Sequence, residues 1–124
     1  MQPERSLIFV YNADSDAMPR ANDLMSRPTG TLTDPCSLIN LTFSPIGMKK
    51  EWKRFISGLR IPVRFLARDE FISEFRTYAA VTTFPEAFLV VGKDLFVIAS
   101  TEEIRRCGDV ADLIAIVEKR LAGS

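Results

Sequence analysis

The chain has 124 residues, a hydrophobic content of 47% and a formal net charge of zero from 16 basic and 16 acidic side chains. This length and hydrophobicity are typical of one domain that buries a core without disulfides, so we treat residues 1–124 as a single domain. A balanced charge argues against the broad basic surface that binds nucleic acid or anionic membranes. We therefore expect neither of these partners.

The chain contains no histidine, which removes the commonest general base and the commonest transition-metal ligand. Its two cysteines, Cys36 and Cys107, form no CxxC pair, and the spacing of Asp14, Asp16 and Asp23 matches no known metal loop. We expect no metal site and no cofactor. The first residues lack the apolar run of a signal peptide and no stretch reaches transmembrane length, so we expect a cytoplasmic protein with reduced thiols.

The first third of the chain begins with a strand and continues as loop and helix. Residues 7–11 are a continuous apolar run, which predicts a strand buried on both faces. Residues 12–16 have loop chemistry and offer helix N-caps, and a helix over residues 17–26 follows. Residues 27–35 contain two prolines, a glycine and three threonines, which is typical of a loop.

The middle of the chain predicts an edge strand and then a helix. Ile39, Leu41 and Phe43 alternate with other residues, which favours a short edge strand over residues 36–43. Ser44 and Pro45 are a good cap and first residue for a helix. That helix carries an apolar stripe at helical spacing. The stripe consists of Trp52, Phe55, Ile56 and Leu59.

The next elements are a strand over residues 63–66 and a helix capped by Asp69. This helix would carry Phe71, Phe75 and Tyr78 on one face. The basic residues around Trp52 in the preceding helix are the solvated face of an amphipathic helix, because the tryptophan belongs to the apolar stripe. They do not change the expectation that nucleic acid is not a partner.

The last third predicts a β-hairpin followed by helices. Pro85 precedes an apolar strand, a tight turn follows at residues 92–94, and a second strand covers residues 95–99. Ser100 and Glu103 form a capping box that opens a short helical turn. Asp109 caps the last helix. Its buried stripe consists of Val110, Leu113, Ile114, Val117 and Leu121.

Strands that alternate with helices indicate an α/β fold with a parallel sheet, to which the hairpin adds antiparallel strands. This order, with a proline at the start of the third strand, resembles the thioredoxin-like superfamily. The resemblance implies a central mixed sheet flanked by helices that ends in a β-hairpin and a helix. It also implies a cis Pro85 beside residues 12–16. From the residues alone, Pro85 could equally be a trans proline that begins an edge strand.

Redox enzymes of that superfamily carry CxxC after the first strand, where this chain has Asn12-Ala13-Asp14-Ser15. Residues 7–15, 47–53 and 65–71 also resemble a group of small uncharacterised bacterial proteins. Members of that group often carry a Cys-x-x-Cys at the segment matching Cys36, and here its second position is Ile39. The resemblance therefore implies that a function of paired cysteines is lost.

We interpret the chain as a non-redox binding or interaction module rather than an enzyme, although the sequence does not decide this. Its ligand or partner, a protein or a small molecule, would bind at the end of the sheet. The residues expected there are Asn12, Ala13, Asp14, Ser15, Phe84 and Pro85. An exposed Phe84 would supply an apolar anchor. An extended peptide could also pair with the exposed backbone of Phe84 if Pro85 is cis.

The alternative function is a thiol-dependent oxidoreductase that acts through Cys36 alone. Its reactivity needs a low pKa, but Asp34 lies close by in sequence and no cation or helix N-terminus is evident, so an inert thiol is favoured. Cys107 ends a helical turn, which disfavours the thiolate, although Arg105 and Arg106 could offset this. A homodimer formed through an edge strand at residues 38–43 is compatible with either function.

Overall fold

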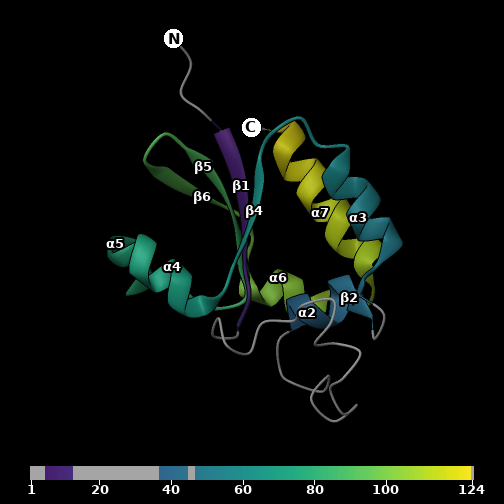
Figure 1. Ribbon diagram of the computed structural model, residues 1–124, viewed down its shortest axis with the longest axis horizontal. Coiled ribbons are helices and arrows are strands. Elements are labelled where there is room, and N and C mark those ends of the chain that lie inside the picture. Colours follow the sequence, from purple (N-terminus) through teal and green to yellow (C-terminus); the bar gives the residue numbers. More distant parts are fainter. Residues whose placement is uncertain (1–4, 13–36, 45–46, 124) are drawn as a thin grey trace.

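A mixed four-stranded sheet lies between two layers of helices in the computed structural model, which describes residues 5–12, 37–44 and 47–123 (Figure 1). The strand order is β4-β1-β5-β6. The first strand is parallel to β4 and antiparallel to β5, and β6 pairs antiparallel with β5 at the edge. The strands are β1 (Arg5–Val10), β4 (Val63–Leu66), β5 (Glu86–Val91) and β6 (Asp94–Ala99). The predicted α/β class with a mixed sheet is confirmed.

The central strand β1 is buried on both faces because its alternate side chains enter two different cores. Leu7 and Phe9 belong to the larger core, whereas Ile8 and Val10 belong to the smaller one. All four side chains are fully buried. The continuous apolar run at the start of the chain is therefore explained, because neither face of this strand meets water.

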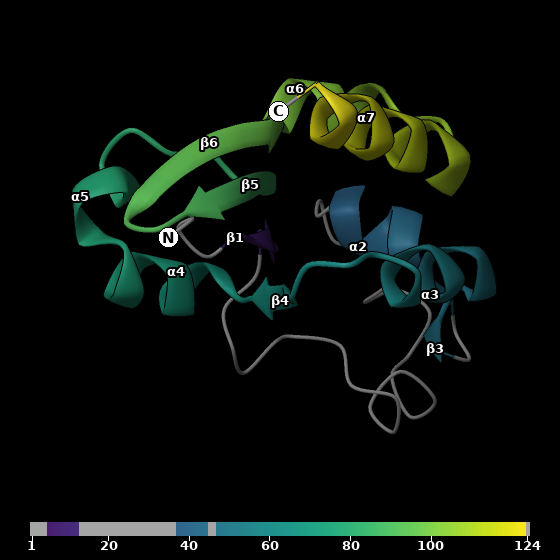
Figure 2. The same ribbon diagram turned by 90° about the horizontal axis from the view of Figure 1, so that it is seen from above.

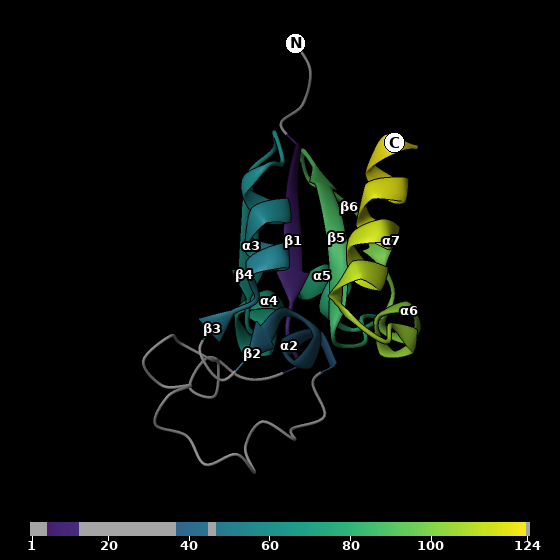
Figure 3. The ribbon, with the colours of Figure 1, turned by 90° about the vertical axis from the view of Figure 1, so that its right-hand side faces the viewer.

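The two helical layers cover opposite faces of the sheet, as the view from above shows (Figure 2). On one face, α3 and α7 lie side by side over the larger core (Figure 3). On the other face lie α4 and α5, over the smaller core. In the described part of the chain, no helix combines the length and apolar character needed to cross a membrane. These helices are α3 (Lys50–Ser57), α4 (Arg68–Glu74), α5 (Arg76–Ala79) and α7 (Val110–Ala122).

The edge strand predicted over residues 36–43 is wrong, because most of this segment is the helix α2 (Ser37–Thr42). Leu38, Leu41 and Thr42 are all buried, and their i, i+3, i+4 spacing is helical. The Thr42 hydroxyl donates a hydrogen bond of 2.7 Å to the Leu38 carbonyl oxygen, one helical turn away. Only Phe43 and Ser44 are extended, as the short strand β2. The dimer edge expected at residues 38–43 therefore does not exist as a strand.

The helix predicted to begin at Ser44 and Pro45 starts later, at Lys50. Ser44 instead pairs with Gly47 in a small hairpin between β2 (Phe43–Ser44) and β3 (Gly47–Met48). Gly47 has φ +123°, a conformation that L side chains rarely adopt. The hairpin uses the residues that would have formed the first helical turns. Trp52, Phe55 and Ile56 of the predicted stripe are helical and pack in the larger core, with Trp52 fully buried. Leu59 packs against the same core but follows the end of the helix.

Asp69 does not cap the fourth helix as predicted, because Arg68 is already its first residue. The N-cap is Ala67, whose backbone N–H donates to Glu70 Oε1 at 2.8 Å, while Asp69 Oδ1 accepts a hydrogen bond from the Glu70 backbone N–H. The predicted single helix is interrupted at Phe75, which has φ −122° and ψ 55°. The apolar face nevertheless continues, since the Phe71 and Phe75 rings stack with centroids 5.2 Å apart.

The C-terminal third agrees with the sequence prediction. The hairpin turns at Gly92, which has φ 63°, and Ser100 caps α6 (Thr101–Arg106) through the expected capping box with Glu103. Asp109 caps α7 by accepting a hydrogen bond from the Asp112 backbone N–H at 3.1 Å. These features depend on contacts between neighbours in the sequence, so local patterns predict them well. The predicted helix over residues 17–26 and loop over residues 27–35 lie outside the described residues.

Candidate functional site

The end of β1 and the start of β5 meet at one end of the sheet. Val10 and Glu86 are directly opposite each other in the antiparallel register. The residues that follow Val10 and those that precede Glu86 therefore leave the sheet at the same place. This arrangement brings Asn12 to the same end as Phe84 and Pro85, as the resemblance implied. Asp14 and Ser15, the other predicted binding residues, lie outside the described residues.

Asn12 connects the end of β1 to the helix on the smaller-core face. Its side-chain oxygen Oδ1 accepts a hydrogen bond of 3.1 Å from Nη1 of Arg68, the first residue of α4. The preceding residue, Tyr11, donates its backbone N–H to the Leu66 carbonyl oxygen at 2.9 Å, which extends the β1–β4 pairing by one residue. The Asn12 side chain is thus bound to α4 and directly follows a residue that is paired with β4.

The Phe84–Pro85 peptide bond is cis, and Pro85 is buried. Phe84 does not have the exposed position that we expected of an apolar anchor. It is half-buried, and its ring contacts Phe71 edge to face with centroids 5.7 Å apart. The smaller core extends beyond the sheet at this point and takes up this ring, which leaves only part of Phe84 accessible to a partner.

The buried residue Glu86 at this end of the sheet was missed by the sequence analysis. Its exposed fraction is 7%, and its carboxylate forms no hydrogen bond or ion pair in the part of the chain that the structure describes. Burial raises the pKa of Glu86 to about 7. A sequence signal was present, because Glu86 is the one charged residue in an otherwise apolar strand, on the same face as Phe88.

Two hydroxyl groups tie this end of the sheet to α6. The side-chain oxygens of Thr83 and Thr101 are 2.6 Å apart, and either can be the donor. Thr101 is buried and is the first residue of α6. The segment that precedes Pro85 is therefore bound to α6, which follows the hairpin. Phe84 and Pro85 are thus held between this contact and the contact of the Phe84 ring with Phe71.

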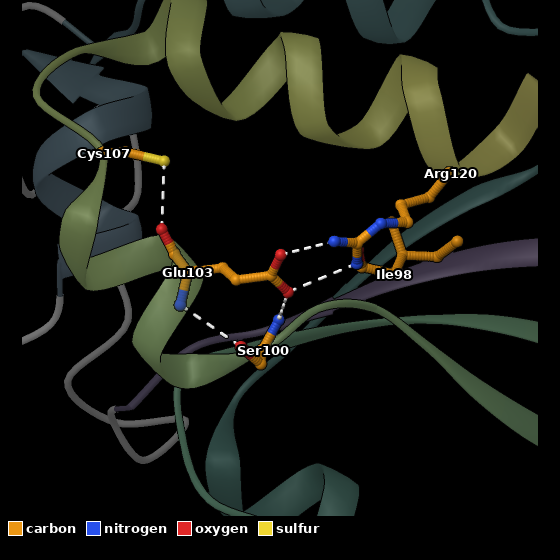
Figure 4. A network of polar contacts seen from close by, with 5 residues as sticks. All are labelled: Ile98, Ser100, Glu103, Cys107 and Arg120. Atoms are coloured by element: carbon orange, nitrogen blue, oxygen red, sulfur yellow. Dashed lines mark hydrogen bonds and ion pairs between the residues drawn. The ribbon is translucent and has the colours of Figure 1, made fainter.

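Cys107, the cysteine within the residues that the structure describes, is not an activated thiol. It caps the C-terminus of α6, and its Sγ donates to the Glu103 carbonyl oxygen at 3.3 Å (Figure 4). Burial raises the pKa of the Cys107 thiol, with further contributions from Asp112, Asp109 and Glu103. Arg105 and Arg106, which we considered as groups that could favour the thiolate, do not lower this pKa. Cys36, the predicted catalytic candidate, lies outside the described residues.

The described part of the chain brings together no cluster of three or more residues able to hold a metal ion. Comparison of the whole chain with protein-family models, with curated proteins and with solved structures finds no match.

Proposed function

We propose that the protein is a non-redox binding module with a thioredoxin-like fold. Its ligand or partner binds at the end of the sheet that carries Asn12, Phe84 and Pro85, together with Asp14 and Ser15. The fold assignment is supported by the strand order β4-β1-β5-β6, in which β5 runs in the opposite direction to the other three strands. A proline beside the end of the first strand is the arrangement expected from the resemblance.

The observation that carries the proposal is the unpaired carboxyl group of Glu86 at this end. The Glu86 oxygens keep slight contact with solvent, but a carboxylate on a residue that is only 7% exposed is largely desolvated and is destabilising without a partner. A ligand that brings an ammonium, guanidinium or other N–H donor to Glu86 would remove this penalty. We therefore propose a ligand or peptide with a cationic group, held beside the half-buried Phe84 ring.

The alternative, an oxidoreductase that acts through Cys36 alone, makes a different prediction. A binding module keeps its affinity after Cys36→Ser, whereas a thiol enzyme loses its activity. Exposure of the protein to oxidised glutathione, followed by intact-mass measurement, reports this chemistry directly. A mixed disulfide formed rapidly at Cys36 at neutral pH would favour the thiol enzyme.

The binding proposal is tested by titrating the full chain, labelled with nitrogen-15, with two short peptides. The probes are acetyl-Ala-Lys-Ala-amide and its uncharged analogue with norleucine in place of lysine. We expect the lysine peptide to shift the amide signals of Asn12, Arg68 and Ala87, and the norleucine peptide to bind more weakly.

The matched variants are Glu86→Gln, which removes the charge at nearly constant shape, and Glu51→Gln at an exposed position of α3. A hydrogen bond to a charged group contributes about 1.5–3 kcal/mol, so Glu86→Gln should weaken binding of the lysine peptide at least about tenfold. Glu51→Gln should leave binding unchanged. Equal binding of both peptides, or shifts confined to another surface, would contradict the proposal.

A further inference from the structure

The strand β6 is an open edge of the sheet, as the view from above shows (Figure 2). We infer that two copies of this chain associate through β6, which pairs antiparallel with β6 of the second copy. This interface is separate from the proposed ligand site and does not depend on it. Most natural edge strands are protected by proline, by charged side chains, by a β-bulge or by a covering element, and the bulge in β6 lies beyond Val97. Residues 95–99 contain no proline and no charged side chain.

The hairpin turn determines which backbone groups of β6 are available to a partner. Val91 and Asp94 are paired on either side of a two-residue turn, so their backbone groups bond to each other. Along β6 the direction then alternates, and the N–H and C=O groups of Leu95 and Val97 face away from β5. The edge therefore offers two residues with outward-facing backbone groups, separated by Phe96.

A β-bulge ends this available edge after Val97. Phe88 pairs with Val97 and Ala87 with Ala99, which leaves Ile98 as the extra residue. The Ile98 carbonyl oxygen accepts a hydrogen bond of 3.0 Å from Nη1 of Arg120 on α7. The available edge is thus short and well defined, which limits the registers in which a second strand can pair with it.

One antiparallel register, centred on Phe96, lets the outward-facing backbone groups of both Leu95 and Val97 form hydrogen bonds at once. It sets Leu95 opposite the partner's Val97 and Val97 opposite the partner's Leu95. Phe96 then faces the partner's Phe96 at a non-hydrogen-bonded position, where cross-strand side chains approach most closely. A two-fold rotation maps this pairing onto itself, as a symmetric dimer requires. The exposed fractions are 54% for Phe96 and 50% for Val97, so both side chains have apolar surface to bury.

The same register also matches charges. It places Asp94 opposite the partner's Ile98, and both residues lie on the face of the sheet that α7 covers, since Asp94 pairs with Val91 and Val91 packs against the larger core. The guanidinium of Arg120 sits at the Ile98 carbonyl group and is bound by Glu103, but a guanidinium has five N–H donors. Asp94 of one copy and the partner's Arg120 are therefore complementary, twice per dimer.

An apolar groove of about 550 Å³ lies beside this edge, and in the dimer the second copy would cover it. Its floor is made mainly by aliphatic and aromatic side chains of β5 and β6. The partner's Phe96 would lie at the mouth of this groove. The zero net charge of the chain offers no general repulsion between copies. The lining residues are Arg5, Leu89, Val91, Phe96, Val97, Ile98, Arg120 and Gly123.

Sedimentation velocity over a range of concentrations of the full chain tests the interface. We expect a reversible dimer whose dissociation constant is raised at least tenfold by Phe96→Lys alone and by Val97→Lys alone. Phe96→Lys sets two ammonium groups face to face, and Val97→Lys places a charge opposite the partner's Leu95. Val81→Lys is the matched control, because Val81 is 84% exposed but lies outside the sheet, and it should leave the dimer intact. A wild-type chain that stays monomeric at 200 µM would overturn the inference.

A cysteine crosslink tests the register without relying on loss of association. In a background of Cys36→Ser and Cys107→Ser, Phe96→Cys should form an intermolecular disulfide on mild oxidation, because paired Cα atoms at this position are within disulfide reach. Lys93→Cys should not, since the register separates the two copies of that position by about 20 Å along the strands. Efficient crosslinking at position 93 and none at position 96 would show that another interface forms the dimer.

Discussion

Val10 and Glu86 face each other across the antiparallel ladder between β1 and β5, and one is a core valine while the other is a buried acid. The pairing places a carboxyl group where the smaller core meets the end of the sheet. The same register brings Asn12 together with Phe84 and Pro85. The position of this pair in the register is therefore what defines the candidate site.

The first prediction concerns stability and pH through Glu86. Its folded-state pKa of about 7 lies above the ordinary value of 4.5, so the folded state binds the proton more tightly than the unfolded state. The stability contributed by this proton is fully present below pH 4.5 and is lost as the pH rises through 7. Glu86→Gln should match the wild type at pH 4 and exceed it at pH 8, by less than the roughly 3 kcal/mol that the full shift would give, because solvent screens part of the charge.

Urea unfolding at several pH values measures this difference, with Glu51→Gln as the exposed control. The comparison between wild type and variant cancels the titration of other groups. A free-energy difference that does not change between pH 4 and pH 8 would show that Glu86 is ionised normally and would remove the main support for the cationic ligand.

The second prediction concerns the capping box of α6. Glu103 accepts hydrogen bonds from the Ser100 backbone N–H and from Arg120, and Ser100 Oγ accepts from the Glu103 backbone N–H (Figure 4). Ser100→Ala should lower the free energy of unfolding by about 1 kcal/mol, since it leaves a helix N–H without its cap. Glu102→Ala is the control, because its contact with Arg106 is exposed and 3.8 Å long. Equal effects of the two substitutions would refute a specific capping role.

The third prediction concerns two glycines with different backbone conformations. Gly47→Ala should destabilise the protein by about 1 kcal/mol or more, because its φ of +123° is unfavourable for a side chain even though no atom lies within 4 Å of the added Cβ. Gly58 has φ −84°, and a Cβ there meets only ordinary contacts. Gly58→Ala should therefore be neutral or slightly stabilising in thermal unfolding. The opposite ranking would mean that the start of β3 does not need glycine.

The fourth prediction concerns the reactivity of Cys107. The pKa of its thiol is raised by burial and by Asp112, Asp109 and Glu103, so alkylation by iodoacetamide at pH 8 should be slower than for a free thiol. Asp109→Asn keeps a good helix cap but removes one negative charge, and should accelerate the reaction. Site-resolved mass spectrometry follows both cysteines in one experiment. Alkylation of Cys107 faster than that of a free thiol would contradict the assignment.

Local signals in the sequence were sufficient for several elements. The continuous apolar run of β1, the hairpin turn at Gly92 and the caps at Ser100 and Asp109 all depend on residues within a few positions of each other. Such features are encoded by side-chain periodicity and by the hydrogen bonds of single turns. The order of these elements also sufficed to predict a mixed sheet, whereas the expectation that Asn12 lies near Pro85 came from the resemblance to the thioredoxin-like superfamily.

Tertiary packing decided what the local pattern left ambiguous. Residues 37–42 carry apolar side chains at both strand and helical spacings, and the helix forms because Leu38, Leu41 and Thr42 are buried together. Phe84 is half-buried because Phe71, which is distant in the sequence, packs against its ring.

The burial of Glu86 follows from its place opposite Val10, which no local spacing specifies. The order of residues is enough to specify the elements whose hydrogen bonds close within one turn or hairpin. Which side chains at the ends of these elements lose contact with water is set by tertiary packing, because burial depends on partners that are far apart along the chain.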